Sequence, residues 1–151
     1  IRIREILALQ YLALATMIVL YSLMFIGGYI SAAGLGLTCP EWPLCPNGVM
    51  PSEEYLVEWI HRTTAATTGM LIIATMIASL INKNADMKIK FTSSLATVLV
   101  ITQITLGALV IDTKLHAVLV AIHLGIGIWL FAMVLLTTLF AFRISKIPKK
   151  I

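Results

Sequence analysis

Four ionisable side chains interrupt long apolar runs of the sequence, and they occur in two short motifs. Glu58, His61 and Arg62 lie in EWIHR, and His123 lies in AIHLGIG. A charged or imidazole side chain within lipid is costly, so such residues tend to line a cavity or hold a ligand. Glu58 and His61 are three residues apart and would share one face of a helix, whereas Arg62 is rotated by about 100° from His61. The EWIHR segment is therefore expected to give its helix one polar side.

The elements that carry these motifs are long enough to cross a membrane. The 151 residues are 60% hydrophobic and only 12% charged, which is far from the composition of a soluble domain. Crossing ~30 Å of hydrocarbon takes roughly 20 apolar residues in a helix. Four runs meet that length and predict transmembrane helices at about 6–30, 55–81, 91–111 and 115–142. We therefore expect an all-α integral membrane protein, in which residues 1–151 form one four-helix bundle with a long loop at 31–54.

Lysine and arginine residues gather on one side of these predicted spans. Most of them flank the start, fill the middle connection or form the tail: Arg2, Arg4, Lys83, Lys88, Lys90, Arg143, Lys146, Lys149 and Lys150. Because positive residues are retained on the cytoplasmic side, both termini are expected to be cytoplasmic and the 31–54 loop extracellular. A basic tail is typical of a topology anchor near anionic lipid, so the net charge of +4 does not indicate a nucleic-acid partner.

The expected outer loop concentrates the unusual residues. The stretch from Thr38 to Arg62 holds both cysteines, four of the five prolines and four of the seven acidic residues. Outside the cytoplasm, Cys39 and Cys45 have no glutathione or thioredoxin to keep them reduced, so we expect a disulfide. It could staple an Ω-like loop, or it could open and close during turnover. A closed zinc site is not expected, because it needs four ligands and no third or fourth is near in the sequence.

His61 and His123 are predicted to lie at similar depths below the outer surface. His61 is about six residues, or ~9 Å, from the start of its helix, which is the outer end. His123 is about eight residues, or roughly 12 Å, from the outer end of its own helix, which is also its start. Haem iron takes two axial ligands from opposite faces, so two level imidazoles could hold a porphyrin between helices. Each histidine could instead be a hydrogen-bonded packing residue. The ligand interpretation is favoured by a repeated plan, in which a helix with an outer glycine, in FIGGYI or TLGALV, precedes a helix with an outer histidine.

His116 and Arg62 would lie nearer the surface. His116 precedes His123 by seven residues, so it would occupy nearly the same helix face about 10 Å further out. It could be an interfacial histidine, a hydrogen-bond donor to a haem propionate, or a ligand at a second site. Arg62 could likewise bind a propionate, or it could extend its charge to the interface.

Together these motifs resemble those of a known family, the haem A synthases. Such enzymes oxidise a methyl group of haem O to the formyl group of haem A for terminal oxidases. The resemblance implies that His61 and His123 bind haem iron, that Glu58 takes part in the oxidation, and that Cys39 and Cys45 form the loop pair. It is carried by GYISAAGLGLTCPEWPLCPNGVMP at 28–51, EWIHR at 58–62 and AIHLGIG at 121–127.

The resemblance also implies a substrate, a cofactor and partners. Haem O would be the substrate, haem b or haem O the bound group, and haem O synthase and an electron acceptor would be partners. The usual family member has eight transmembrane helices in two similar halves, and this chain matches the cysteine-bearing half. Two copies would restore the other half by two-fold symmetry, so we expect a homodimer or higher homo-oligomer in the cell membrane.

Glu58 separates this hypothesis from two others. A carboxylate one turn above His61 could take protons from the methyl group, or it could pair with Arg62 or be solvated at the interface. A non-catalytic b-type cytochrome or haem-handling assembly factor would use the same histidines and would not need Glu58. A quinone-linked disulfide generator normally has a second cysteine pair to relay electrons, and the sequence contains only two cysteines.

Overall fold

The computed structural model describes residues 2–46 and 49–144. Over these ranges it is all-helical and contains no β-strand. The elements are α1 (Arg2–Ala33), the short 3-10 helix η1 (Glu53–Tyr55), α2 (Leu56–Ile81), α3 (Met87–Asp112) and α4 (Ala117–Ile144). Each of the four α-helices is long and apolar enough to cross a membrane, which confirms the predicted fold class. The basic tail residues Lys146, Lys149 and Lys150 lie outside the described ranges.

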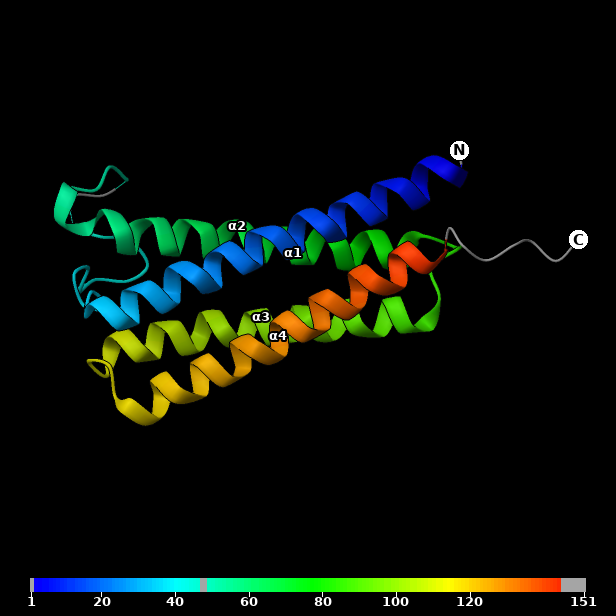
Figure 1. The fold of residues 1–151 in the computed structure, drawn as a ribbon. Coiled ribbons are helices and arrows are strands. Elements are labelled where there is room, and N and C mark those ends of the chain that lie inside the picture. Colours follow the sequence, from blue (N-terminus) through cyan, green and yellow to red (C-terminus); the bar gives the residue numbers. More distant parts are fainter. Residues whose placement is uncertain (1, 47–48, 145–151) are drawn as a thin grey trace, which may run out of the picture.

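The four α-helices form an antiparallel bundle (Figure 1). α1 packs against α2 and α4, and α3 packs against the same two helices. Residues 34–46 and 49–55 and the α3–α4 turn lie at one end, which we call the loop end. The N-terminus, the α2–α3 connection and the end of α4 lie at the other, which we call the terminal end. The EWIHR and AIHLGIG motifs therefore both lie in the half of the bundle nearer the loop end.

A glycine sets the end of α1. Gly34 has a φ of +69°, a conformation that side-chain-bearing residues adopt rarely, and the Leu35 N–H bonds back to the Ile30 carbonyl at 3.0 Å. This is the glycine-terminated helix end that caps the last carbonyls. α1 consequently continues to Ala33, past the predicted end near residue 30.

A carboxylate cap sets the start of α3. The Asp86 side chain accepts a hydrogen bond from the Ile89 N–H at 3.0 Å, which satisfies one of the free N–H groups of the first turn. α3 therefore begins at Met87, before the predicted start near residue 91. The helix also gains polar residues that the apolar run alone does not include.

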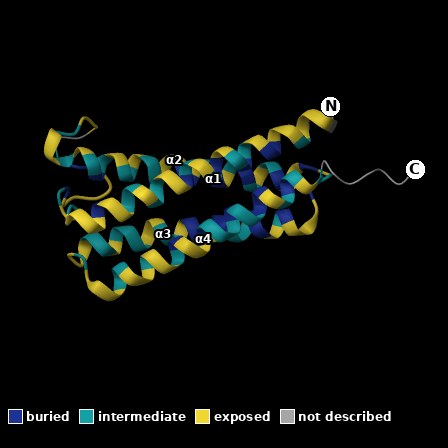
Figure 2. Ribbon diagram, in the orientation of Figure 1, coloured by how far each residue is buried: buried dark blue, intermediate teal, exposed yellow. Residues whose placement is uncertain are grey.

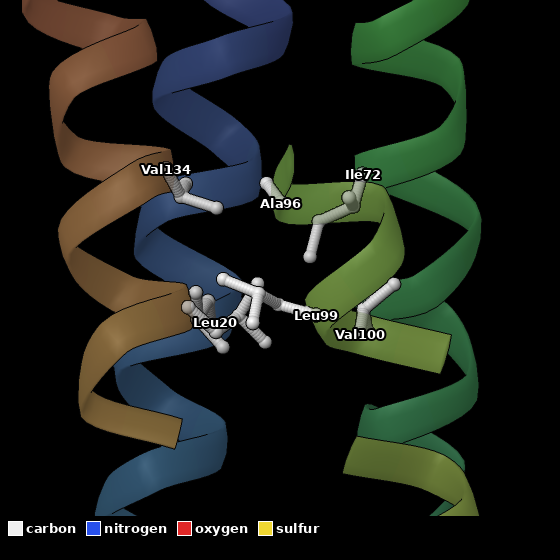
Figure 3. Close-up of a cluster of buried hydrophobic side chains, with 7 residues drawn as sticks. Leu20, Ile72, Ala96, Leu99, Val100 and Val134 are labelled. Atoms are coloured by element: carbon white, nitrogen blue, oxygen red, sulfur yellow. The ribbon is translucent and has the colours of Figure 1, made fainter. Parts of the chain in front are cut away.

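A hydrophobic cluster closes the middle of the bundle. Figure 3 shows its side chains pointing toward one another between the helices. All four helices contribute, with Leu20, Ile72, Ala96, Leu99, Val100, Leu130 and Val134 buried. The cluster separates the loop-end half from the terminal-end half.

Buried hydroxyl groups link neighbouring helices in the terminal half. Three pairs are 3.0, 2.7 and 2.8 Å apart: Thr16 with Thr75, Ser79 with Ser93, and Thr137 with Thr92. The cavity lined by several of these residues measures about 10 Å³, no more than one water-sized sphere. This half is therefore closely packed.

The loop half is packed less tightly, although it contains both deep histidines. Every fully buried residue of α3 lies between Ile89 and Val100, and every one of α4 lies between Gly127 and Ala141. Figure 2 shows that the loop-end halves of these helices are exposed or half-buried. The fold thus places the candidate site where the helices leave the most side-chain surface uncovered.

Candidate functional site

His61 lies in the second turn of α2, against the backbone of α1. A Cβ atom added to Gly27 would be 3.0 Å from His61 Cε1, so a larger residue at 27 would displace the ring. The Nδ1 atom of His61 is shielded from solvent and has no hydrogen-bond partner within residues 2–46 and 49–144. Buried polar atoms are nearly always paired, so an unpaired one calls for an explanation.

His123 has the same relation to the other helix pair. A Cβ atom on Gly107 of α3 would lie 3.6 Å from His123 Cε1. The Nδ1 atom of His123 is also shielded and unpaired in the described part of the chain. In both pairs, a glycine of the first helix faces the histidine of the second. The structure therefore has the repeated arrangement of glycine and histidine that the sequence indicated.

The two imidazoles come from helices on opposite sides of the bundle. Among the residues that the structure describes, no three His, Cys, Asp or Glu side chains are grouped to hold a metal ion. Two imidazoles suit an iron whose remaining ligands come from a porphyrin, whereas a closed zinc site takes four protein ligands. The donor set and the glycine contacts fit haem.

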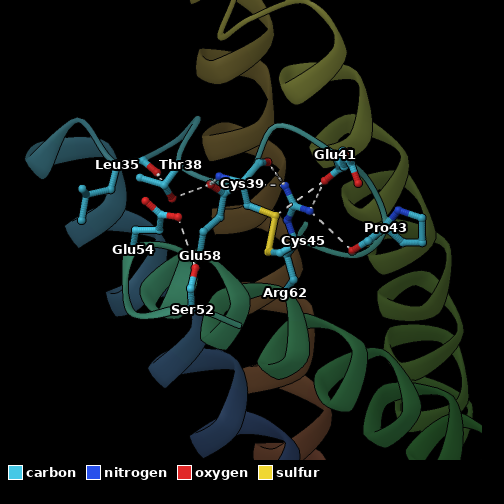
Figure 4. Close-up of a disulfide and its surroundings, with 10 residues drawn as sticks. All are labelled: Leu35, Thr38, Cys39, Glu41, Pro43, Cys45, Ser52, Glu54, Glu58 and Arg62. Atoms are coloured by element: carbon cyan, nitrogen blue, oxygen red, sulfur yellow. Dashed lines mark hydrogen bonds and ion pairs between the residues drawn. A yellow bond between two sulfur atoms is a disulfide. The ribbon is translucent and has the colours of Figure 1, made fainter. Parts of the chain in front are cut away.

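Glu58 is buried one turn before His61, with 3% of its surface exposed. Its Oε2 accepts hydrogen bonds from the Thr38 hydroxyl at 2.9 Å and from the Cys39 N–H at 2.8 Å. Its Oε1 forms an ion pair with Arg62 at 2.6 Å. Figure 4 shows the carboxylate held between α2 and the loop that precedes it. The Glu58–Arg62 ion pair, which the sequence left open as an alternative to a catalytic role for Glu58, is thus present.

Arg62 ties the start of α2 to the loop. Its guanidinium donates to the backbone carbonyls of Cys39 at 2.7 Å, Glu41 and Pro43, in addition to the Glu58 carboxylate (Figure 4). These bonds use Nη1 and Nη2, which between them carry four N–H donors. A haem propionate at Arg62 would compete with the loop carbonyls for those donors.

The loop is closed by the predicted disulfide. Cys39 and Cys45 are bonded, with their Cα atoms 5.1 Å apart. Both residues are almost completely buried. Thiol–disulfide exchange requires an attacking thiolate to reach a sulfur atom, so this burial favours a structural staple over a pair that opens during turnover.

His116 differs from the two deep histidines. It is exposed, in the turn before α4. A cavity of about 440 Å³ lies between the disulfide loop and the loop end of α3, with Trp42 and Asp112 in its lining. Neither His61 nor His123 lines this cavity. The cavity and the histidine pair are therefore separate features of the loop half.

Sequence reasoning missed Gln103 of α3. Its Oε1 is shielded from solvent and lacks a hydrogen-bond partner within the described ranges, as do the two histidine nitrogens. A carboxamide inside an apolar helix is uncommon and could have drawn attention to this position. Its contacts depend on the register between α3 and α4, which composition does not reveal.

Comparisons with known proteins add a family match. The COX15-CtaA family of cytochrome oxidase assembly proteins matches residues 51–150. A haem A synthase of Bacillus licheniformis is 33% identical over 145 residues, covering 94% of this chain and 48% of that protein. One from Bacillus pumilus is 29% identical over 150 residues, covering 95% and 48%. A protohaem IX farnesyltransferase of Halobacterium salinarum is 30% identical over 115 residues, covering 74% and 26%. The chain spans about half the length of the curated haem A synthases it matches.

Proposed function

Because this chain belongs to the COX15-CtaA family, we propose that it is a haem A synthase unit that oxidises a methyl group of haem O to the formyl group of haem A. The chain is a multi-pass membrane protein. The site that we propose lies in the loop half of the bundle. The observation that carries the proposal is the pair of shielded imidazoles of His61 and His123, each packed against a glycine. On this proposal, the two imidazoles would hold the iron of one haem b or haem O.

The protein contributes position and proton handling to this reaction. The haem, with an electron acceptor that takes four electrons, would supply the oxidising power that an unactivated methyl group requires, and water would supply the formyl oxygen as four protons leave. His61 and His123 orient the porphyrin, and Gly27 and Gly107 leave room for both rings. Arg62 and His116 are the proposed partners of the propionates, with Arg62 exchanging a loop carbonyl for a propionate oxygen.

Glu58 is the proposed proton acceptor. It lies one turn from His61, and its position is held by Arg62, the Thr38 hydroxyl and the Cys39 N–H. A carboxylate has about four lone-pair sites, so these three hydrogen bonds leave one for a proton from the substrate. The loop contacts thus fix the carboxylate in place and leave it able to act as a base.

Glu58→Gln is the test of this role. The variant should still bind haem, because Glu58 does not ligate iron, but conversion of haem O to haem A should fall by about 10²–10⁴-fold, the usual contribution of a general base. Conversion is measured by extracting the pigment from cells that make haem O and separating the haems. Glu54→Gln is the matched control, because Glu54 is exposed and accepts a hydrogen bond from the Ser52 hydroxyl.

A second candidate function is a non-catalytic b-type cytochrome or haem-handling assembly factor. It is favoured by the structural use of Glu58, whose carboxylate joins α2 to the disulfide loop. A normal yield of haem A from Glu58→Gln would select this function. The quinone-linked disulfide generator is disfavoured, because Cys39 and Cys45 are buried and are the only cysteines of the sequence.

Location and assembly are part of the proposal. We place the disulfide loop on the extracellular side of the cell membrane, which labelling with an impermeant thiol reagent after reduction would check. The chain's likeness to part of a protohaem IX farnesyltransferase supports a link to haem O synthase.

A homodimer or higher homo-oligomer would supply a second four-helix unit, and a strictly monomeric active particle in mild detergent would contradict it.

A further inference from the structure

Gln103 lies on the helix face that carries the site glycine of α3. It precedes Gly107, which faces His123, by four residues, about 6 Å along the helix toward the terminal end. Across the helix pair it meets Gly127 of α4, where an added Cβ would be 2.9 Å from Gln103 Nε2. The carboxamide therefore occupies the space that a side chain at position 127 would fill.

The carbonyl oxygen of this carboxamide needs a donor that the described chain does not supply. Gln103 Oε1 is shielded and unpaired, whereas Gln10 in the terminal half donates to the Ala141 carbonyl at 2.9 Å. Leaving a shielded amide oxygen without a partner is costly. His123, whose Nδ1 is also shielded and unpaired, precedes Gly127 on α4 by four residues, or about one helical turn. Both unpaired groups thus belong to the same region.

The other helix pair has no such carboxamide. If Gly27 and His61 correspond to Gly107 and His123, the residues one turn further toward the terminal end are Leu23 and Ala65. Both are apolar, and Leu23 packs against the central hydrophobic cluster. One turn below the glycine–histidine contact, the α3–α4 pair therefore carries a polar side chain, whereas the α1–α2 pair does not. A ligand that matched this site would carry one hydrogen-bond donor on one edge.

We propose that Gln103 is a specificity-determining residue whose Oε1 accepts a hydrogen bond from the hydroxyl group of haem O. This inference rests on the proposed function. Haem O has a hydroxylated farnesyl substituent where protohaem has a vinyl group, so only haem O offers a donor there. The offset between Gln103 and the level of His123, about 6 Å, is comparable to the half-width of a porphyrin. A site with a buried acceptor rejects the analogue that lacks the donor, because its own polar atom stays unpaired.

Haem titrations of the purified protein in detergent test this proposal. Binding of haem O and of protohaem is followed at the Soret band for the wild type, Gln103→Leu and Gln103→Met. Both variants should bind haem O roughly tenfold more weakly, the value of one net hydrogen bond, and should bind protohaem as the wild type does. Equal weakening for both haems, or none for either, overturns the proposal.

Two glycines provide a matched test that leaves Gln103 in place. Gly127→Ala pushes a methyl group against the carboxamide and should lower the preference for haem O. Gly125→Ala, where an added Cβ meets nothing within 4 Å, should leave it unchanged. If the Gln103 variants do not fold, this pair decides the outcome, and equal preferences in both alanine variants contradict the role. A wild type that binds neither haem would instead refute the proposed function.

Discussion

In the terminal half of the bundle, buried polar side chains pair across the helices, whereas in the loop half three shielded polar atoms have no partner among the described residues. In the terminal half, Thr138 bonds to the Ala13 carbonyl at 3.2 Å, and Gln10 bonds to that of Ala141 at 2.9 Å. In the loop half, the atoms without partners belong to His61, Gln103 and His123. Both halves are built from the same four apolar helices.

The difference shows how to separate two uses of polar residues in membrane helices. Hydroxyl and amide groups that hydrogen-bond to one another hold helices together, so they contribute to the packing of the bundle. Imidazole and amide groups that are buried without a protein partner are placed to bind a group that the chain itself does not provide. In this protein the two uses occupy different levels of one bundle, with a hydrophobic cluster between them.

The largest expected effect comes from removing an axial ligand. His61→Ala or His123→Ala should abolish the low-spin, six-coordinate haem spectrum, with a loss of affinity beyond the roughly 10–100-fold typical of disturbing an outer-shell partner. Haem content per chain and the Soret band of purified variants provide the measurement. His116→Ala is the control for ligation only: as a proposed propionate partner it can lower haem content, but the haem that binds should keep its six-coordinate spectrum, because His116 does not ligate iron in the proposal. An unchanged spectrum in either alanine variant would remove that histidine from the site.

A smaller effect is expected from crowding a ligand without removing it. Gly27→Ala places a methyl group 3.0 Å from the His61 ring, so the ring must tilt and haem affinity should fall by about tenfold. Gly28→Ala is its neighbour and control, since a Cβ there meets nothing within 4 Å. Haem titrations of the two variants, carried out side by side, give the ratio of their haem affinities. Equal affinities would show that the glycine contact does not position His61.

The smallest effect should come from the terminal half. Thr16→Val removes the hydroxyl pair with Thr75 and should destabilise the fold by about 0.6 kcal/mol, the average for hydrogen bonds between membrane helices. Thermal unfolding in detergent measures the loss, and the Soret band should be unchanged. If Thr16→Val lowered haem binding as much as Gly27→Ala, the two halves would not be functionally distinct.

Much of the fold could be predicted from sequence, because four apolar runs of membrane-spanning length leave few alternatives to a helical bundle. The disulfide followed from two cysteines in a loop expected to face an oxidising compartment. The predicted positions of the helix ends were less accurate, since hydropathy alone does not include local capping interactions. Gly34 ends α1 and Asp86 begins α3 through backbone geometry and one hydrogen bond.

The candidate site could be predicted only at positions where the type of a single residue indicates its role. His61 and His123 stood out as imidazoles in apolar helices. The repeated pattern indicated a glycine on the preceding helix of each pair, but the contact of Gly27 and Gly107 with the histidine rings was seen only in the structure. Glu58 was recognised, but its bond to the Cys39 N–H depends on the path of the loop backbone, which side-chain identity does not encode. Gln103 was missed because its role depends on which residue of α4 lies opposite it.

We propose that the loop half of this bundle holds a haem between His61 and His123. The absorption spectrum of the wild-type protein, purified in detergent from haem-replete cells, tests this directly when the extracted pigment is also analysed by mass. We expect a low-spin, six-coordinate b- or o-type haem that copurifies in proportion to the protein. A colourless wild-type preparation from such cells would contradict it.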